Sequence, residues 1–222
     1  MEGSGKVITV AFIFIAIMAI VALVMGAIGA ATSSISGVSD SLATVAGEIA
    51  YSNATPEDVA SVKAFLERMK NGEIKCKYDR VSLGVGVKKS HHGGEQCKGY
   101  AKCVWETCFG ITPGSTKKNR YELNDTAGMQ KVGTIKADSP TKVKELFTAA
   151  KPGDFIQMVW ASGGLHSAIV YSVTDGGTTW IQNNKGGNVT TWMQDYSWST
   201  LASSLNYVSI YTPTNYKLAY NN

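Results

Sequence analysis

The sequence has 222 residues, of which 44% are hydrophobic and 17% are charged, a composition typical of a folded protein rather than a disordered one. The net charge is only +4, and the lysines and arginines form no basic stripe interleaved with aromatic residues. We therefore exclude nucleic acid as the expected partner. The length fits a single domain with an appendage, and we expect a monomer.

The first 31 residues contain a long hydrophobic segment. Val7–Ala31 has 25 residues without a charge, and as a helix it would rise about 37 Å, enough to cross a membrane. We interpret residues 1–31 as a transmembrane anchor or, because Gly29–Ala31 offers small residues for cleavage, as a signal peptide. Lys6 precedes the segment and the next lysine is Lys63, which favours a C-terminal domain outside the cytoplasm. The expected protein is single-pass in the cell membrane, or secreted if the segment is cleaved.

Residues 32–54 are rich in Ser, Ala, Gly and Thr and predict a flexible tether. The domain proper is expected over residues 55–222, and it opens with a predicted helix. Thr55 can cap this helix, Pro56 suits its first position, and Asn71 precedes a glycine that ends it.

Two further helices are predicted. Residues 73–95 lack clear periodicity and predict an irregular segment, after which a helix is expected over Cys97–Phe109, ending at Gly110. One face of that helix carries Cys97, Ala101, Val104, Trp105 and Cys108. A third helix is predicted over 140–150, with Ser139 as its cap.

The remainder of the chain is rich in strand signals, whereas residues 110–135 are expected to be loop. The predicted strands are Asp154–Trp160, Leu165–Val173, Thr178–Asn184, Val189–Met193 and Tyr207–Tyr211. Glycine-rich turns join the first three of them. Helices followed by an antiparallel sheet indicate an α+β fold.

Four cysteines, all in the part predicted to lie outside the cytoplasm, allow two interpretations of Cys97. An oxidising compartment favours disulfides, and four cysteines can pair completely. Alternatively, Cys97 begins a helix, where the helix dipole stabilises the thiolate that acts as a nucleophile. The glycine-rich loop before it can present backbone N–H groups to a developing oxyanion. If Cys97 is a nucleophile, Cys108 belongs to the core and Cys103 can reach Cys76.

Histidine is scarce, with three residues, and His166 lies at the start of an apolar strand. In the next predicted strand, the side-chain period of two places Gln182 and Asn184 on one face. Antiparallel pairing can bring that face beside His166, where an amide carbonyl can accept an imidazole N–H and fix its tautomer. The adjacent pair His91-His92 does not have the spacing typical of a structural zinc site, and no metal is expected.

Several motifs, in the same order, resemble the CHAP and NlpC/P60 families of papain-like cysteine amidases and peptidases. Gln96-Cys97-Lys98-Gly99-Tyr100-Ala101 is similar to the cysteine signature of CHAP amidases. Lys151–Ile156 contains the Pro-Gly-Asp strand opening, Gly164–Val170 resembles the histidine strand, and Gln182–Asn184 resembles the polar end of the next strand. The resemblance covers about residues 55–212.

This resemblance implies a papain-like half-barrel antiparallel sheet packed on a helix that bears the cysteine. It implies cleavage of a peptide or amide bond, often in peptidoglycan, through a thioester and without a cofactor. Cys97 would be the nucleophile, His166 the base and Asn184 the residue that orients the base. Gln96 would lie near the oxyanion, and Gln182 stands where relatives can carry an acid. This departure, and Lys185 in place of the usual Trp, weaken the assignment of the third catalytic residue.

Three functions are compatible with these motifs. The first is an extracytoplasmic cysteine amidase or endopeptidase acting on peptidoglycan. The second is a catalytically idle module on the same fold that binds the cell wall or a surface partner. The third is an acyl or amide transferase that uses the same thioester chemistry.

Overall fold

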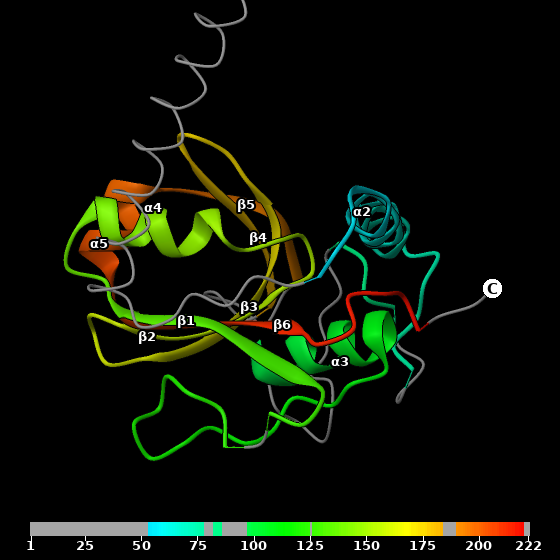
Figure 1. The fold of residues 1–222 in the computed structure, drawn as a ribbon, viewed down its shortest axis with the longest axis horizontal. Coiled ribbons are helices and arrows are strands. Elements are labelled where there is room, and N and C mark those ends of the chain that lie inside the picture. Colours follow the sequence, from blue (N-terminus) through cyan, green and yellow to red (C-terminus); the bar gives the residue numbers. More distant parts are fainter. Residues whose placement is uncertain (1–52, 78–81, 86–96, 125, 184–189, 220–222) are drawn as a thin grey trace, which may run out of the picture. The chain divides into compact units, whose positions relative to one another are not determined.

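A computed structural model describes residues 53–77, 82–85, 97–124, 126–183 and 190–219 (Figure 1). The predicted anchor or signal peptide and nearly all of the tether lie outside these residues. Within the described ranges, no helix is both long and apolar enough to span a membrane.

The described residues form four helices and a single six-stranded sheet, so the α+β prediction is confirmed. The helices are α2 (Pro56–Lys70), α3 (Cys97–Phe109), α4 (Pro140–Thr148) and α5 (Trp198–Ser204). The strands are β1 (Met129–Lys136), β2 (Phe155–Trp160), β3 (Leu165–Val173), β4 (Gly177–Asn183), β5 (Thr190–Ser197) and β6 (Leu205–Pro213). The sheet is open and antiparallel, in the order β1-β6-β2-β3-β4-β5.

The predicted helices form where their capping residues indicate. Thr55 accepts a hydrogen bond from the backbone N–H of Asp58, and the Asp58 carboxylate accepts one from the N–H of Thr55. This reciprocal capping box, together with Pro56 in the first turn, starts α2. Ser139 caps α4 by accepting from the N–H of Lys142 at 3.2 Å.

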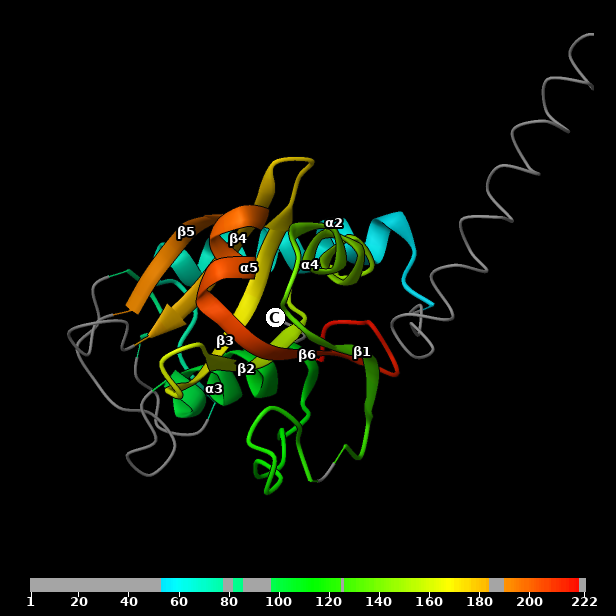
Figure 2. The same ribbon diagram turned by 90° about the vertical axis from the view of Figure 1, so that its left-hand side faces the viewer.

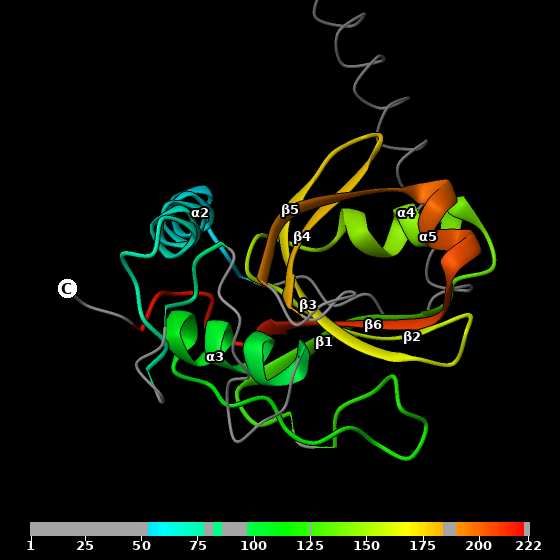
Figure 3. The ribbon, with the colours of Figure 1, turned by 180° about the vertical axis from the view of Figure 1, so that it is seen from behind.

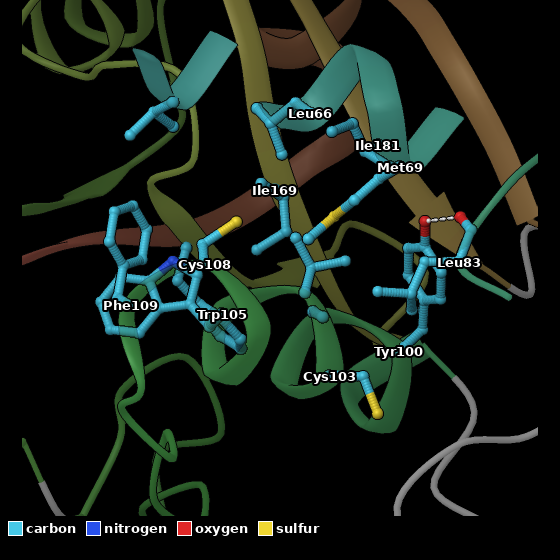
Figure 4. Packing of buried hydrophobic residues seen from close by; sticks show 14 of the residues in the cluster. Leu66, Met69, Leu83, Tyr100, Cys103, Trp105, Cys108, Phe109, Ile169 and Ile181 are labelled. Carbon is cyan, nitrogen blue, oxygen red and sulfur yellow. Dashed lines mark hydrogen bonds between the residues drawn. The ribbon is translucent and has the colours of Figure 1, made fainter. Parts of the chain in front are cut away.

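Each face of the sheet packs against its own pair of helices. On one face, apolar residues of α2 and α3 pack with Phe155, Ile169 and Ile181 (Figure 4). On the other face, residues of α4 and α5 pack with Ala168 and Val170. Figures 2 and 3 show α3 on the side of the sheet opposite to α4 and α5. The alternation of side chains along β3 therefore divides the core into two layers.

Helix α3 lies deep in the molecule, because most of its residues from Gly99 onward are buried. The indole of Trp105 donates to the carbonyl of Gly153 at 2.5 Å, near the start of β2. Nearer the start of the helix, the hydroxyl of Tyr100 donates to the carbonyl of Leu83 at 2.9 Å (Figure 4). These bonds fix the helix between the sheet and the segment that precedes it.

A disulfide joins α3 to that preceding segment. It links Cys76 to Cys103, with Cα atoms 5.5 Å apart, which is the pairing considered from the sequence. The backbone N–H of Lys77 also donates to the hydroxyl of Thr107 at 3.2 Å. The segment before Cys97 is thus anchored to the same helix that Cys97 begins.

Two elements were not predicted. Strand β1 occupies Met129–Lys136, within and just beyond the stretch expected to be loop, so that expectation was wrong there. A register shift between Lys131 and Gly133 breaks the period of two, so its buried residues do not alternate regularly. Helix α5 was missed because it has only seven residues, most of them Ser, Thr or Ala.

Asp154, which follows the Pro-Gly pair before β2, is completely buried. One carboxylate oxygen accepts the N–H of Lys151 at 2.8 Å, while the other has no hydrogen-bond partner among the described residues. Burial raises the pKa of this carboxyl from 3.8 to about 7, although the bond from Lys151 and the nearby Thr212 hydroxyl oppose the rise. The Thr212 hydroxyl itself forms no hydrogen bond with the described residues.

This buried acid predicts a pH-dependent stability. Between pH 4 and 7 the folded protein holds the proton and the unfolded chain releases it, so the free energy of unfolding falls as pH rises through that window. The difference in pKa corresponds to a loss of at most about 4 kcal/mol. Urea unfolding of Asp154→Asn, which stays neutral, should lack this component of the pH slope. The exposed Asp175→Asn serves as the control, and equal slopes in wild type and Asp154→Asn would refute the assignment.

Candidate functional site

Cys97 is the first residue of α3 and its thiol is free and half-buried. The first turn of the helix contains no acidic residue and carries Lys98, whose amine donates to the hydroxyl of Thr116 at 3.0 Å. Cys97 therefore stands at the start of a helix with a free thiol, as the sequence predicted.

The other three cysteines have structural positions. Cys76 and Cys103 form the disulfide, and Cys108 is fully buried on the face of α3 that packs against the sheet. Burial raises the pKa of the Cys108 thiol well above its ordinary value. Complete pairing of the four cysteines, one of the two interpretations of the sequence, does not occur in this structure.

His166 is paired with Gln182 from the neighbouring strand. The register of β3 and β4 sets Ala168 opposite Gln182, two residues beyond His166 on the same face. His166 Nε2 and Gln182 Oε1 lie 2.7 Å apart, and both side chains are buried. The sequence predicted that the polar face of β4 would lie beside His166. The structure confirms this, and Gln182 is the residue in contact.

Gln182 is held in turn by Tyr196 of β5. Its amide nitrogen donates to the Tyr196 hydroxyl at 2.8 Å, so its carbonyl oxygen faces His166. An amide oxygen only accepts, so His166 carries its proton on Nε2 when neutral, and the lone pair is on Nδ1. The ring of Trp160, centred 5.9 Å from that of His166, covers part of the imidazole. In this tautomer Nδ1 is the basic nitrogen of the ring.

Helix α3, which begins with Cys97, packs against β3, which carries His166. The two residues are nevertheless assigned to different faces of the sheet. Helix α3 packs against β3 and β4 on the face of Ile169. The alternation along β3 assigns His166 to the other face, with Ala168 and Val170. His166 is the second residue of β3 and so lies near the end of the strand.

Two site residues expected from the sequence lie outside the described residues. Gln96, expected near the oxyanion, immediately precedes α3, and Asn184, expected to orient the base, immediately follows β4. His91 and His92 are also outside. Within the described residues, no group of His, Cys, Asp and Glu is arranged to hold a metal ion.

The sequence did not predict the contact between Tyr196 and Gln182, because β5 was expected to end at Met193. The strand continues to Ser197, and Met193 has a backbone φ of 58°, which is rare for a residue other than glycine. The register with β4 shifts near this point. A bulge of this kind breaks the period of two, so alternation could not assign Tyr196 to the face of His166.

Comparison with known proteins assigns no family. No protein-family model and no curated protein matches the chain. The structural matches include a crystal structure of Ly7917, at 15% identity and a TM-score of 0.41, covering 71% of this chain and 63% of that one. They also include Ly7917 with the hydrolyzing product of MDP, at 17% identity and a TM-score of 0.37, covering 73% and 64%. The chain thus spans less than two thirds of these proteins, and similarity this low assigns no function.

The different environments of the cysteines predict selective alkylation. Under native conditions iodoacetamide should modify Cys97 at least about a hundredfold faster than Cys108, because reaction at Cys108 requires opening of the core. Peptide mass spectrometry without reduction should also recover Cys76 linked to Cys103. Comparable labelling of Cys97 and Cys108, or a native disulfide at Cys97, would contradict this assignment.

Proposed function

We propose that the protein is an extracytoplasmic cysteine amidase or endopeptidase that cleaves peptide or amide bonds in peptidoglycan. The observation that carries the proposal is the contact between His166 and Gln182, which sets the tautomer a base requires. A free, half-buried cysteine at the start of a helix supplies a nucleophile. The motifs around Cys97, Asp154, His166 and Gln182 support the choice of substrate, since they resemble those of CHAP and NlpC/P60 proteins.

In the first half of the proposed reaction, the Cys97 sulfur attacks the carbonyl carbon of the amide. His166 Nδ1 takes the thiol proton, and the carbonyl oxygen becomes a tetrahedral oxyanion. The C–N bond then breaks, His166 returns the proton to the leaving amine, and a thioester remains on Cys97. In the second half, His166 removes a proton from water, which attacks the thioester and releases a carboxylic acid and the free thiol.

Gln182 contributes orientation rather than charge to this reaction. Because its amide is neutral, it holds the ring of His166 without adding the Coulombic stabilisation that a carboxylate would give to the imidazolium. Position 182 of this chain thus carries a neutral amide where relatives can carry an acid.

Digestion of purified peptidoglycan by the full chain in mild detergent tests the proposal. The wild type should release fragments with a new carboxyl group, and in water enriched in heavy oxygen each new carboxyl should contain one labelled atom. Cys97→Ala and His166→Ala should each lower the initial rate at least about a thousandfold, as loss of members of a catalytic pair does. Cys108→Ala is the matched control and should retain the rate.

Other outcomes would identify the alternative functions. Fragments joined to an added amine, without heavy oxygen, would indicate a transferase. Binding of peptidoglycan without any cleavage would indicate an idle binding module. Undiminished cleavage by Cys97→Ala would exclude the proposed nucleophile.

A further inference from the structure

Residues 116–123 form a short loop that carries three basic residues, and we call it the basic loop. An antiparallel bridge between Thr116 and Leu123 closes it. Leu123 packs in the same core layer as α3, so the basic loop lies on the face of the sheet that α3 covers. Its charged residues are Lys117, Lys118, Arg120 and Glu122. The loop therefore presents an excess of positive charge on the side of the sheet where α3 begins with Cys97.

The start of the basic loop contacts the first turn of α3. The amine of Lys98 donates to the hydroxyl of Thr116 at 3.0 Å, and Lys98 directly follows Cys97. A substrate with its reacting bond at Cys97 can therefore reach the loop with groups only a few bonds away.

The other end of the basic loop contacts the end of the sheet that carries His166. Tyr121 stacks on Tyr207 of β6, with ring centroids 4.5 Å apart and ring planes 14° apart. In the register of the sheet, Tyr207 pairs with Val159, and Val159 pairs with Leu165. Leu165 directly precedes His166. Contacts with both α3 and this end of the sheet place the loop beside the candidate site.

The backbone of Arg120 is fixed within the basic loop. Its N–H donates to the carbonyl of Lys117 at 2.8 Å, and its own carbonyl accepts from the Gln157 amide at 3.2 Å. Gln157 is buried and accepts from the hydroxyl of Ser167 at 2.7 Å. The φ of Arg120 is 72°, which is uncommon for a residue other than glycine. Residues held in such conformations concentrate at functional sites, and a fixed backbone lowers the entropy cost of binding.

Two cations of the basic loop have no partner in the part of the chain that the structure describes. Glu122 forms ion pairs with Lys117 at 3.4 Å and Lys131 at 2.9 Å, so the one acid of the loop is already engaged. The side chains of Lys118 and Arg120 are exposed and form no ion pair or hydrogen bond with the described residues. The planar guanidinium of an arginine matches a carboxylate with two parallel N–H donors.

We propose that the basic loop is a subsite that binds a carboxylate of the substrate, with Arg120 as the contacting residue and Lys118 as an additional positive charge. The substrate class is then an acidic peptide, and peptidoglycan fits it because its peptides bear free carboxylates. The inference deepens the proposed function and rests on it for the choice of polymer. A carboxylate held at the loop would orient the peptide across the start of α3 without entering the reaction.

Binding of the full-length Cys97→Ala variant in mild detergent tests the subsite without turnover. Purified peptidoglycan freed of phosphate polymers by acid is compared with the same material after carbodiimide coupling of its carboxylates to ammonia. Cosedimentation should show binding at least about tenfold tighter to the untreated material than to the amidated one. Adding Arg120→Gln should weaken binding to the untreated material about tenfold and leave binding to the amidated material unchanged.

Three results of this experiment would overturn the inference. The first is equal binding to the two preparations, including no binding to either. The second is the same affinity with and without Arg120→Gln. The third is binding only to peptidoglycan that retains its phosphate polymers, which would identify phosphate as the ligand.

Arg120→Lys and Lys144→Gln are the matched controls. Arg120→Lys retains the charge with a similar backbone preference and should bind within about threefold of the parent chain. Lys144 is an exposed lysine of α4, on the opposite face of the sheet, and Lys144→Gln should bind as the parent does. A loss in Arg120→Lys as large as in Arg120→Gln would show that charge at this position does not bind the substrate. An equal loss in Lys144→Gln would show that only the total charge matters, and either result would overturn the inference.

Cleavage kinetics separate this inference from the proposed function. In the otherwise wild-type chain, Arg120→Gln should raise the apparent KM for peptidoglycan about tenfold and change kcat less than about twofold, because the subsite lies away from the reacting bond. Normal cleavage with an unchanged KM would overturn the subsite and leave the proposed function intact. Carboxylate-dependent binding by a wild-type chain that cleaves nothing would refute the proposed function and support the subsite.

Discussion

The hydrogen bond between His166 and Gln182 is the interaction on which the candidate site depends. It exists because the antiparallel register of β3 and β4 sets Gln182 opposite Ala168, on the face that also carries His166. A slip of one residue in this pairing would turn Gln182 to the other face and replace it with Ile181 or Asn183. The short turn between the two strands fixes the register, so a local feature of the chain determines the pairing of His166 with Gln182.

Cys97 is positioned by a different constraint, the burial of α3. This helix is fixed in its second half by the bond from Trp105 to Gly153 and near its start by the bond from Tyr100 to Leu83. The disulfide between Cys76 and Cys103 adds a covalent tether to the segment that leads toward Cys97. Packing, hydrogen bonding and a crosslink together hold α3, the helix that Cys97 begins.

The sequence predicted the elements whose boundaries depend on local chemistry. Capping by Thr55 and Ser139 gave the starts of two helices, and the Gly-rich turns separated β2, β3 and β4 correctly. The proximity of Gln182 to His166 followed from the period of two and the turn between their strands. Two of the missed features, β1 and the contact of Tyr196 with Gln182, lie beside register shifts, which are set by pairing with a distant strand and leave no local signal.

The cooperation of Cys97 with His166 is the central claim, and it needs a direct test because α3 packs on the face of β3 opposite to the one to which alternation assigns His166. The measurement is the rate of Cys97 alkylation by iodoacetamide between pH 5 and 10 in the wild type and in His166→Ala. If His166 activates the thiol, the rate near pH 6 should fall at least about tenfold in the variant and converge with the wild type near pH 10. Identical rates across the whole pH range would show that Cys97 and His166 do not act together.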